Sequence, residues 1–244
     1  MKSKHLGRKT EYRLESYSPN FLDSVNRNSS NKISSFFGHD FWNAYEFSYL
    51  NSLNQPVLES IEIKIPMTSS VTVESKSLKL YLASFFNKKF SDPKKAYKLI
   101  EKDLSNLTDS NVSVKKKISY QSSPKSLLLN SATRNIAKNK VIKFEGFRSI
   151  CPVTSQPDWA NIYFYSASHS IAPKPLIKLM KSFRSRGDFH EACIESIFLS
   201  MLEDLNIEDL TVYGRFLRRG GIDINPLRST KKKFIFLNFR DSVQ

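Results

Sequence analysis

Two ten-residue stretches decide the fold: KSLKLYLASF at residues 76–85 and KPLIKLMKSF at residues 174–183. Apolar residues recur in both at the spacing of one helical face, which predicts two amphipathic helices. The two stretches also match each other at a constant offset, pairing Lys76 with Lys174, Leu78 with Leu176, Leu82 with Met180, and Phe85 with Phe183. An internal duplication explains the match most simply, and chance similarity between amphipathic helices is the alternative.

A second helix follows each of these stretches. Asp92 and Pro93 form a typical N-cap and first helical position, and another helix is predicted to begin near Asp188. Phe90 and Phe189 precede the two helices at matching places. Predicted strands flank both helix pairs. In the first half, Ile61, Ile63 and Ile65 alternate with polar residues up to Pro66, and a strand segment is also predicted from Val112 to Tyr120. In the second half the predicted strands are residues 141–147, 160–166, 210–216 and 233–238.

Each half is therefore predicted to contain two strands, two helices and two further strands, in that order. This order predicts an α+β fold made of tandem duplicated modules, each an antiparallel sheet with two helices on one face. A polar stretch at residues 121–140, rich in Ser, Asn and Lys, marks the junction. We expect an N-terminal module at residues 1–125 and a C-terminal module at residues 126–244.

Composition narrows the class of protein. The 244 residues are 40% hydrophobic, enough to bury a sizeable core. No run approaches the roughly 20 apolar residues of a membrane span, and the stretch from Met1 to Tyr17 lacks the apolar core of a signal peptide. With only two cysteines, Cys151 and Cys193, the chain is expected to be soluble and cytoplasmic, with free thiols.

A formal net charge of +15 favours an anionic partner. Nucleic acid is one candidate, because clustered Lys and Arg release counterions from a phosphate backbone. The basic runs are short, however, at Lys115 to Lys117 and Lys231 to Lys233, and a dinucleotide phosphate would be attracted by the same field. Charge alone does not choose between these partners.

Two common cofactor signatures are missing from the sequence. Its seven glycines form neither Gly-x-Gly-x-x-Gly nor a phosphate loop, so a bound dinucleotide would lie outside a Rossmann cradle. The cysteines and four histidines have no metal-ligand spacing, and no metal site is expected.

The densest polar chemistry lies between Arg148 and Trp159, in a segment that contains Cys151, Pro152, Pro157 and Asp158. Two prolines stiffen this loop and could hold a thiol and a carboxyl at a repeatable separation. The pair suits a nucleophile and a proton donor. The alternatives are a small buried cysteine and a loop-capping aspartate.

Three further motifs are ambiguous by themselves. His190 and Glu191 open a predicted helix, where an acid also complements the helix dipole. The run from Glu74 to Ser77 precedes another helix, so capping is its structural interpretation. The Arg218–Gly221 run is either an anion site or a turn.

Together, these motifs resemble those of the 7-cyano-7-deazaguanine reductase (QueF) family. The segment from Glu74 to Tyr81 is similar to the family's NADPH signature, and blocks of similar sequence follow in family order at residues 42–47, 151–159, 189–191 and 218–226. The signature precedes the cysteine, as in the two-module form of the family. The resemblance implies tandem tunnelling-fold (T-fold) modules, NADPH as cofactor, a role in queuosine biosynthesis for tRNA modification, a homodimer, and no direct contact with nucleic acid.

The resemblance also implies roles for individual residues. Cys151 would be the nucleophile that forms a thioimide with the nitrile, and Asp158 would be the proton donor. The implied substrate-binding residues are Val73, Glu74, Ser75, His190 and Glu191, and the implied NADPH-binding residues are Ser75, Lys76, Arg219 and Gly220.

Two residues depart from the family pattern: Ser155 and Ala160 stand where Gly is usual. If Gly supplies a positive φ at the first position, Ser155 carries some strain. Two alternatives to a nitrile reductase stay open, an amidine-forming relative of the same fold and an RNA-binding module.

The halves are predicted to divide the chemistry. The first keeps Glu74, Ser75 and Lys76, but its Phe90-Ser91-Asp92 lacks the His-Glu pair of the second half. We therefore expect one competent pocket per chain that uses residues of both halves, closed either within one chain or across a dimer.

Overall fold

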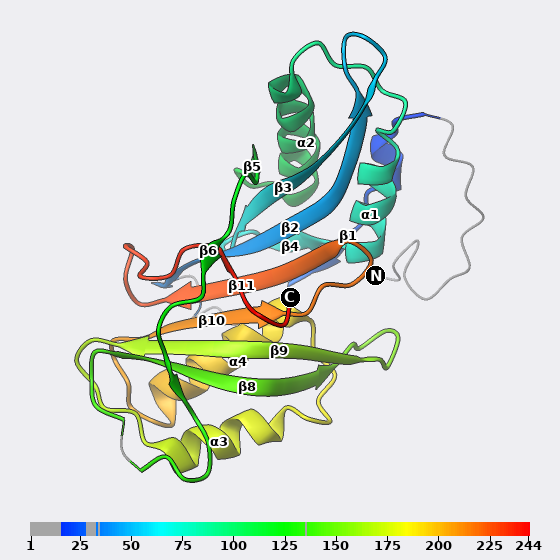
Figure 1. Cartoon of the computed structure of the whole chain (residues 1–244). Coiled ribbons are helices and arrows are strands. Elements are labelled where there is room, and N and C mark those ends of the chain that lie inside the picture. Colours follow the sequence, from blue (N-terminus) through cyan, green and yellow to red (C-terminus); the bar gives the residue numbers. More distant parts are fainter. Residues whose placement is uncertain (1–15, 28–32, 34, 135) are drawn as a thin grey trace. The chain divides into compact units, whose positions relative to one another are not determined.

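The computed structural model describes residues 16–27, 33, 35–134 and 136–244 as a mixed α+β protein (Figure 1). The chain forms two compact units. Unit 1 contains residues 16–27, Phe41–Ser119 and Arg218–Asp223, and unit 2 contains the described part of 28–40 with Tyr120–Leu217 and Ile224–Gln244. The predicted modules at 1–125 and 126–244 stay a prediction, and residues 1–15 of the first lie outside the described residues. None of the described helices combines the length and hydropathy needed to cross a bilayer.

Unit 1 is built on strands β2 and β3, with β5 at the edge beside β3. Its elements are η1 (Pro19–Phe21), β1 (Ser24–Asn26), β2 (Phe37–Leu50, in this unit from Phe41), β3 (Pro56–Pro66), β4 (Val71–Val73), α1 (Ser75–Ala83), α2 (Pro93–Thr108) and β5 (Ser113–Lys116). Short strands β1 and β4 pair separately, antiparallel.

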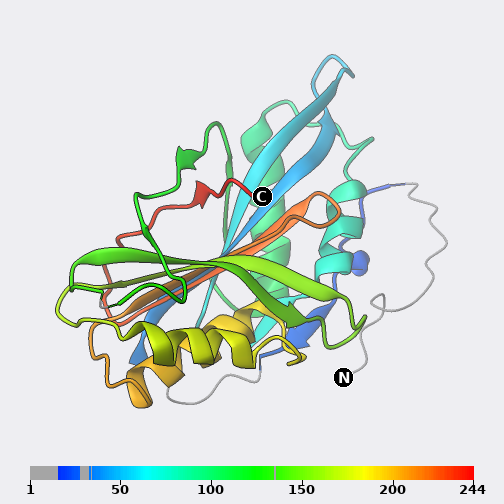
Figure 2. The same cartoon turned by 60° about the horizontal axis from the view of Figure 1, so that its bottom comes forward.

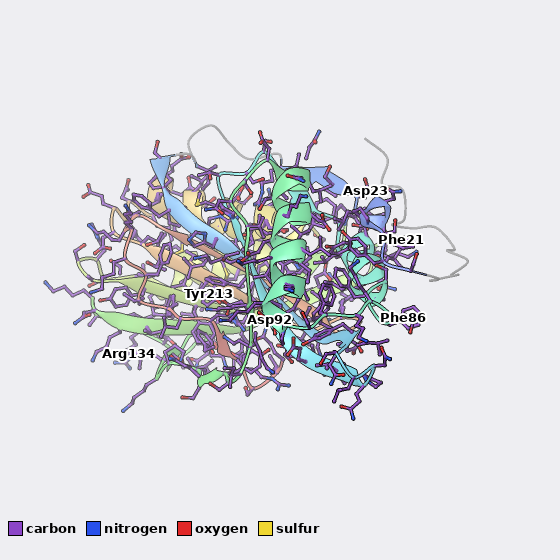
Figure 3. The ribbon with its side chains drawn as sticks, turned by 90° about the horizontal axis from the view of Figure 1, so that it is seen from above. Phe21, Asp23, Phe86, Asp92, Arg134 and Tyr213 are labelled. Carbon is purple, nitrogen blue, oxygen red and sulfur yellow. The ribbon has the colours of Figure 1, made fainter. Side chains whose placement is uncertain are left out.

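Aromatic rings join the strands of unit 1 to its helical layer. Phe47 of β2 lies 5.4 Å, between ring centroids, from Phe85 just after α1, and Tyr49 lies 5.7 Å from Phe90 just before α2. These edge-on pairs add about 0.5–1.5 kcal/mol each beyond the burial of their area. The predicted cap of α2 is confirmed, since the Asp92 carboxylate accepts the backbone N–H of Lys94 at 2.9 Å (Figure 3).

Unit 2 contains, in chain order, two long strands, two helices and two further strands. Its main elements are β8 (Lys140–Ile150), β9 (Pro157–Ser166), α3 (Pro173–Ser182), α4 (His190–Glu203), β10 (Thr211–Phe216) and β11 (Ile222–Ser229, in this unit from Ile224). The strands run in the order β11-β10-β9-β8-β7, antiparallel except at the short β7 (Leu127–Leu128), which is parallel to β8. Both helices lie on one face of this sheet (Figure 2).

The C-terminal segment covers the opposite face of that sheet (Figure 2). Its short strand β12 (Phe239–Arg240) pairs in parallel with β6 (Gln121–Ser122). The buried Phe239 ring lies 5.0 Å from Tyr163 and 5.6 Å from Tyr213, so aromatic packing holds the segment in place.

Two strand predictions need correction. Residues 233–238 were expected to close the fold as a strand, but the structure places the last long strand, β11, at Ile222–Ser229. Phe236 is nevertheless buried, because the segment packs through its rings without joining the main ladder. Within the predicted strand segment from Val112 to Tyr120, the strand β5 covers Ser113–Lys116. Ile118 lies beyond its end and is 86% exposed.

The longest strand, β2, was not predicted from periodicity. Its side chains are buried in an almost continuous run between Gly38 and Tyr45, so the alternation that marks a half-buried strand is absent.

Candidate functional site

The loop around Cys151 is a closed hairpin between β8 and β9. The Cys151 N–H donates to the carbonyl of Gln156 at 2.8 Å, and the Ser155 N–H donates to the carbonyl of Cys151 at 3.0 Å. Cys151 itself is half-buried. The loop is shorter than expected, at residues 151–156, because Pro157, Asp158 and Trp159 belong to β9. Main-chain hydrogen bonds as well as Pro152 thus hold Cys151 in place.

Ser155 adopts the left-handed conformation, with φ of 57°. The predicted strain at this usual glycine position is therefore confirmed, because an L side chain rarely adopts positive φ without cost. Ala160, the other residue at a position where the family usually has Gly, is buried in β9 and does not have a positive φ.

A neighbouring segment supports the loop from the side. The Ile150 N–H donates to the carbonyl of Arg186 at 3.0 Å, and Ile150 forms a parallel bridge with Gly187. A Cβ placed on Gly187 would lie 3.7 Å from the Cα of Pro152. The main chain just before α4 is thus in contact with the loop that carries Cys151.

Asp158 and His190 lie together in unit 2. Asp158 is 6% exposed, and its Oδ2 atom lies 3.4 Å from Nε2 of His190. The His190 ring stacks on Phe216 with 4.0 Å between centroids and an 18° interplanar angle. The start of α4 therefore positions an imidazole against the proposed proton donor.

Glu191 follows His190 in the first turn of α4 and is 6% exposed. Free backbone N–H groups and the positive end of the helix dipole stabilise an acid at such a position. The predicted opening of this helix at His190 and Glu191 is confirmed, with Phe189 as its N-cap.

Cys193 is a buried thiol of a different kind. It is fully buried on α4, and burial raises the pKa of its thiol to about 12. Its Sγ donates to the carbonyl of Asp188 at 3.8 Å. A thiol protonated at neutral pH is a poor nucleophile, so this environment indicates a packing role for Cys193.

In unit 1, Glu74 caps α1. Its Oε1 accepts the N–H of Lys76 at 2.7 Å and its Oε2 accepts the N–H of Ser77 at 2.8 Å. The structural interpretation of this motif is thus confirmed. The Ser75 hydroxyl lies 3.3 Å from the same carboxylate, and Val73 is buried at the end of β4.

The turn at Arg219 and Gly220 lies against Lys79 of α1. Gly220 has φ of 54°, and a Cβ there would meet Nζ of Lys79 at 2.8 Å. Burial lowers the pKa of Lys79 and Arg219 lowers it further, while Glu74 and Glu46 act in the opposite direction. Lys79 and Arg219 thus place two neighbouring cations at an exposed turn, and the Glu74 and Glu46 carboxylates partly offset them.

Strand β2 holds this turn in place. The Tyr45 N–H donates to the carbonyl of Gly221 at 2.9 Å, and the Asn43 amide donates to Asp223 at 2.7 Å. The Arg218 guanidinium lies 4.9 Å from the centroid of the Tyr45 ring. The block at residues 42–47 thus serves as the support of the glycine-rich turn.

Lys79 and Glu46 lie within the Glu74–Tyr81 and 42–47 motifs, but no role was predicted for either residue. Their position inside those motifs was the available signal. The remaining predicted residues fall into two sets, each within one unit: Val73, Glu74, Ser75, Lys76, Arg219 and Gly220 in unit 1, and Cys151, Asp158, His190 and Glu191 in unit 2.

Comparison with known proteins identifies two matched segments. Residues 12–116 match the family described as nitrile reductase, 7-cyano-7-deazaguanine-reductase N-term, and residues 157–234 match that described as QueF-like protein. The first segment includes the Glu74 motif, the second includes Asp158 and His190, and Cys151 lies between them.

Curated relatives match over nearly the whole chain. A protein of Coxiella burnetii is 36% identical over 98% of this chain and 96% of its own length. Proteins of Hahella chejuensis and Desulfotalea psychrophila are each 35% identical over 93% of this chain, covering 93% and 92% of their own lengths. All three are named NADPH-dependent 7-cyano-7-deazaguanine reductase. At this identity and coverage, the chain belongs to the 7-cyano-7-deazaguanine reductase family.

Proposed function

We propose that the chain reduces the nitrile of 7-cyano-7-deazaguanine to an aminomethyl group at the expense of two NADPH, in queuosine biosynthesis. The observation that carries the proposal is the hairpin that holds Cys151 beside strand β9, where Asp158 meets His190 at 3.4 Å. Family membership supplies the substrate and the reductant.

The first step assigned to the chain is covalent capture. A nitrile carbon is weakly electrophilic, so a thiolate traps it better than water does. The Cys151 sulfur forms the C–S bond as one π bond of the nitrile breaks, and the developing nitrogen anion takes a proton from Asp158 to give a thioimide. His190 is proposed to orient the Asp158 carboxyl through the contact at 3.4 Å.

Reduction then needs four electrons. When bound, NADPH would supply these electrons as hydride, one from each of two molecules. Lys76, Lys79 and Arg219 would bind the phosphates of the cofactor, and the turn at Gly220 would leave room for their close approach.

Glu191 is proposed to accept hydrogen bonds from the guanine-like edge of the substrate. A buried acceptor that a wrong ligand leaves unpaired costs about 1–3 kcal/mol, so such a group gives specificity. Val73, Glu74 and Ser75 would line the substrate on the unit 1 side of the chemistry. The single pocket that uses both sets of residues stays a prediction.

The finer architecture is also part of the proposal. We infer that each half is a T-fold module, that the protein is a homodimer, and that it works in the cytoplasm. The two helices on one face of an antiparallel sheet in unit 2 support the module assignment.

The RNA-binding alternative loses its best local support in the structure. Lys115 and Lys117 contact Glu62 at 2.9 and 3.0 Å, and Lys116 contacts Glu59 at 3.0 Å. Carboxylates thus offset this basic run, which supports a small anionic partner over a nucleic-acid backbone at this edge strand.

The decisive experiment incubates the protein with 7-cyano-7-deazaguanine and follows NADPH absorbance. We expect two NADPH oxidised per aminomethyl product. Amidine formation without NADPH oxidation would instead indicate the amidine-forming relative, and RNA binding with no turnover would indicate the binding module.

A matched pair of cysteine variants tests the covalent step. Without NADPH, the wild type and Cys193→Ala should each gain the mass of one substrate per chain, whereas Cys151→Ala should gain none and lose turnover. Turnover retained in Cys151→Ala, or two adducts per chain, would refute the mechanism.

A further inference from the structure

Unit 2 contains a cavity that the proposed reaction does not use. It encloses about 230 Å³ between β8 and α3, the helix at the front of Figure 2. Its lining is half apolar and half charged: Phe144, Phe147 and Met180, with Glu145, Arg148, Lys181 and Arg184, and Gly146 completing the wall.

A β-bulge shapes one wall of this cavity. The register between β8 and β9 shifts between Phe144 and Phe147, and Gly146 adopts φ of 71° within the bulge. No atom lies within 4 Å of the place where a Cβ of Gly146 would stand. Bulges commonly redirect side chains next to functional sites, and here the bulge leaves the wall open.

The charge of the lining is strongly positive. Arg148, Lys181 and Arg184 contribute three cations, and the one carboxylate, Glu145, is engaged by Lys143 at 2.8 Å. An anion entering the cavity would therefore meet uncompensated positive charge.

Arg148 is held ready for such an anion. Its Nη1 donates to the backbone carbonyl of Arg184, and its guanidinium lies 5.9 Å from the centroid of the Trp159 ring. Fixing a guanidinium before binding reduces the entropy lost when a phosphate is bound.

The apolar side chains of the lining indicate which group could accompany the phosphate. Phe147 and Met180 are fully buried behind the wall, and the half-buried Phe144 offers the accessible apolar surface on which a ring could pack. Pockets for drug-sized ligands enclose about 300–1,000 Å³, so a cavity of this size excludes a whole dinucleotide.

We propose that this cavity binds a small organic phosphate: a phosphate monoester on a single-ring body, with the phosphate on Arg148, Lys181 and Arg184 and the ring against Phe144.

The test uses phenyl phosphate as the probe, followed by calorimetry and by the fluorescence of Trp159, which is 38% exposed. Phenyl phosphate should bind and change this fluorescence. Inorganic phosphate should bind at least about tenfold more weakly, because it buries no ring. Equal affinity for the two probes would overturn the ring site.

Variants on α3 and just after its C-terminal end supply the matched comparison. Lys181→Gln and Arg184→Gln should each weaken phenyl phosphate binding by about threefold to tenfold, and the backbone acceptor of Arg148 survives in both. Lys174→Gln, on the same helix but outside the cavity, should bind as the wild type does. Loss of binding only in Lys174→Gln, or in none of the three, would overturn the proposal.

Saturating NADPH separates this cavity from the cofactor site. Phenyl phosphate should bind with unchanged affinity in its presence, and Lys181→Gln should keep the wild-type KM for NADPH. Competition with NADPH, or tighter binding of a short RNA through the same residues, would assign the cavity to one of those ligands instead.

Discussion

Nε2 of His190, the first residue of α4, lies 3.4 Å from Oδ2 of Asp158, the second residue of β9. The contact joins two sequence blocks that are 32 positions apart, and stacking on Phe216 fixes the ring that makes it. At this distance the imidazole can orient the carboxyl of Asp158, the proposed proton donor.

Asp158→Asn should therefore lower kcat by about 10²–10⁴-fold, the usual contribution of a general acid, while keeping the fold. The amide has the shape of the carboxyl but gives up no acidic proton. Turnover and the rate of adduct formation without NADPH should both fall. A kcat within threefold of wild type would remove Asp158 from the mechanism.

The buried thiol of Cys193 makes stability depend on alkaline pH. Burial raises its pKa from 9.0 to about 12, so the unfolded chain releases this proton first. The contribution of this thiol to the free energy of unfolding is fully present below pH 9. It is lost as pH rises toward 12, with a slope of up to about 1.4 kcal/mol per pH unit. Urea unfolding between pH 9 and 11 should show a steeper loss for wild type than for Cys193→Ala. Parallel slopes would contradict the assignment.

The two departures from the family's glycines should respond in opposite directions. Ser155→Gly relieves the cost of φ at 57° and should raise the free energy of unfolding by about 0.5–1 kcal/mol. Ala160→Gly, in the middle of a buried strand, removes a packed methyl and should lower it by about 1–2 kcal/mol. Urea midpoints of the two variants measure this, and a shift of the same sign in both would contradict it.

Lys76→Ala should raise KM for NADPH and leave the covalent adduct able to form. The substitution removes the ammonium but keeps the backbone N–H that Glu74 accepts at 2.7 Å, so the cap of α1 survives. Lys94→Ala, on the exposed face of α2, is the control and should leave KM unchanged. Loss of the adduct in Lys76→Ala would place this lysine at the substrate.

Glu191→Ala should weaken substrate binding and leave the KM for NADPH unchanged. Removing a buried acceptor at 6% exposure should weaken adduct formation by about 2 kcal/mol or more. Glu191→Gln keeps the shape and should fall between the alanine variant and wild type. Adduct titration without NADPH is the measurement, and an unchanged titration would show that Glu191 does not contact the substrate.

Local signals predicted the elements that local physics controls. Asp92 and Pro93 began α2 where expected, because a side-chain cap and a fixed φ act within one turn. The alternation of Ile61, Ile63 and Ile65 gave β3, which ends at Pro66. Strand β2 could not be found this way, since burial on both faces removes the alternation.

The sequence by itself determined the helix pairs, the presence of a stiff loop around Cys151, and the family, because these depend on neighbouring residues and on ordered motifs. Only the tertiary structure decided which side chains those residues contact. It brought His190 to Asp158, set Lys79 beside Arg219 and Gly220, and gathered Arg148, Lys181 and Arg184 around one cavity. The physical reason is that contact between distant segments depends on strand register and helix packing, which sum many weak interactions along the chain and leave no signature at any single position.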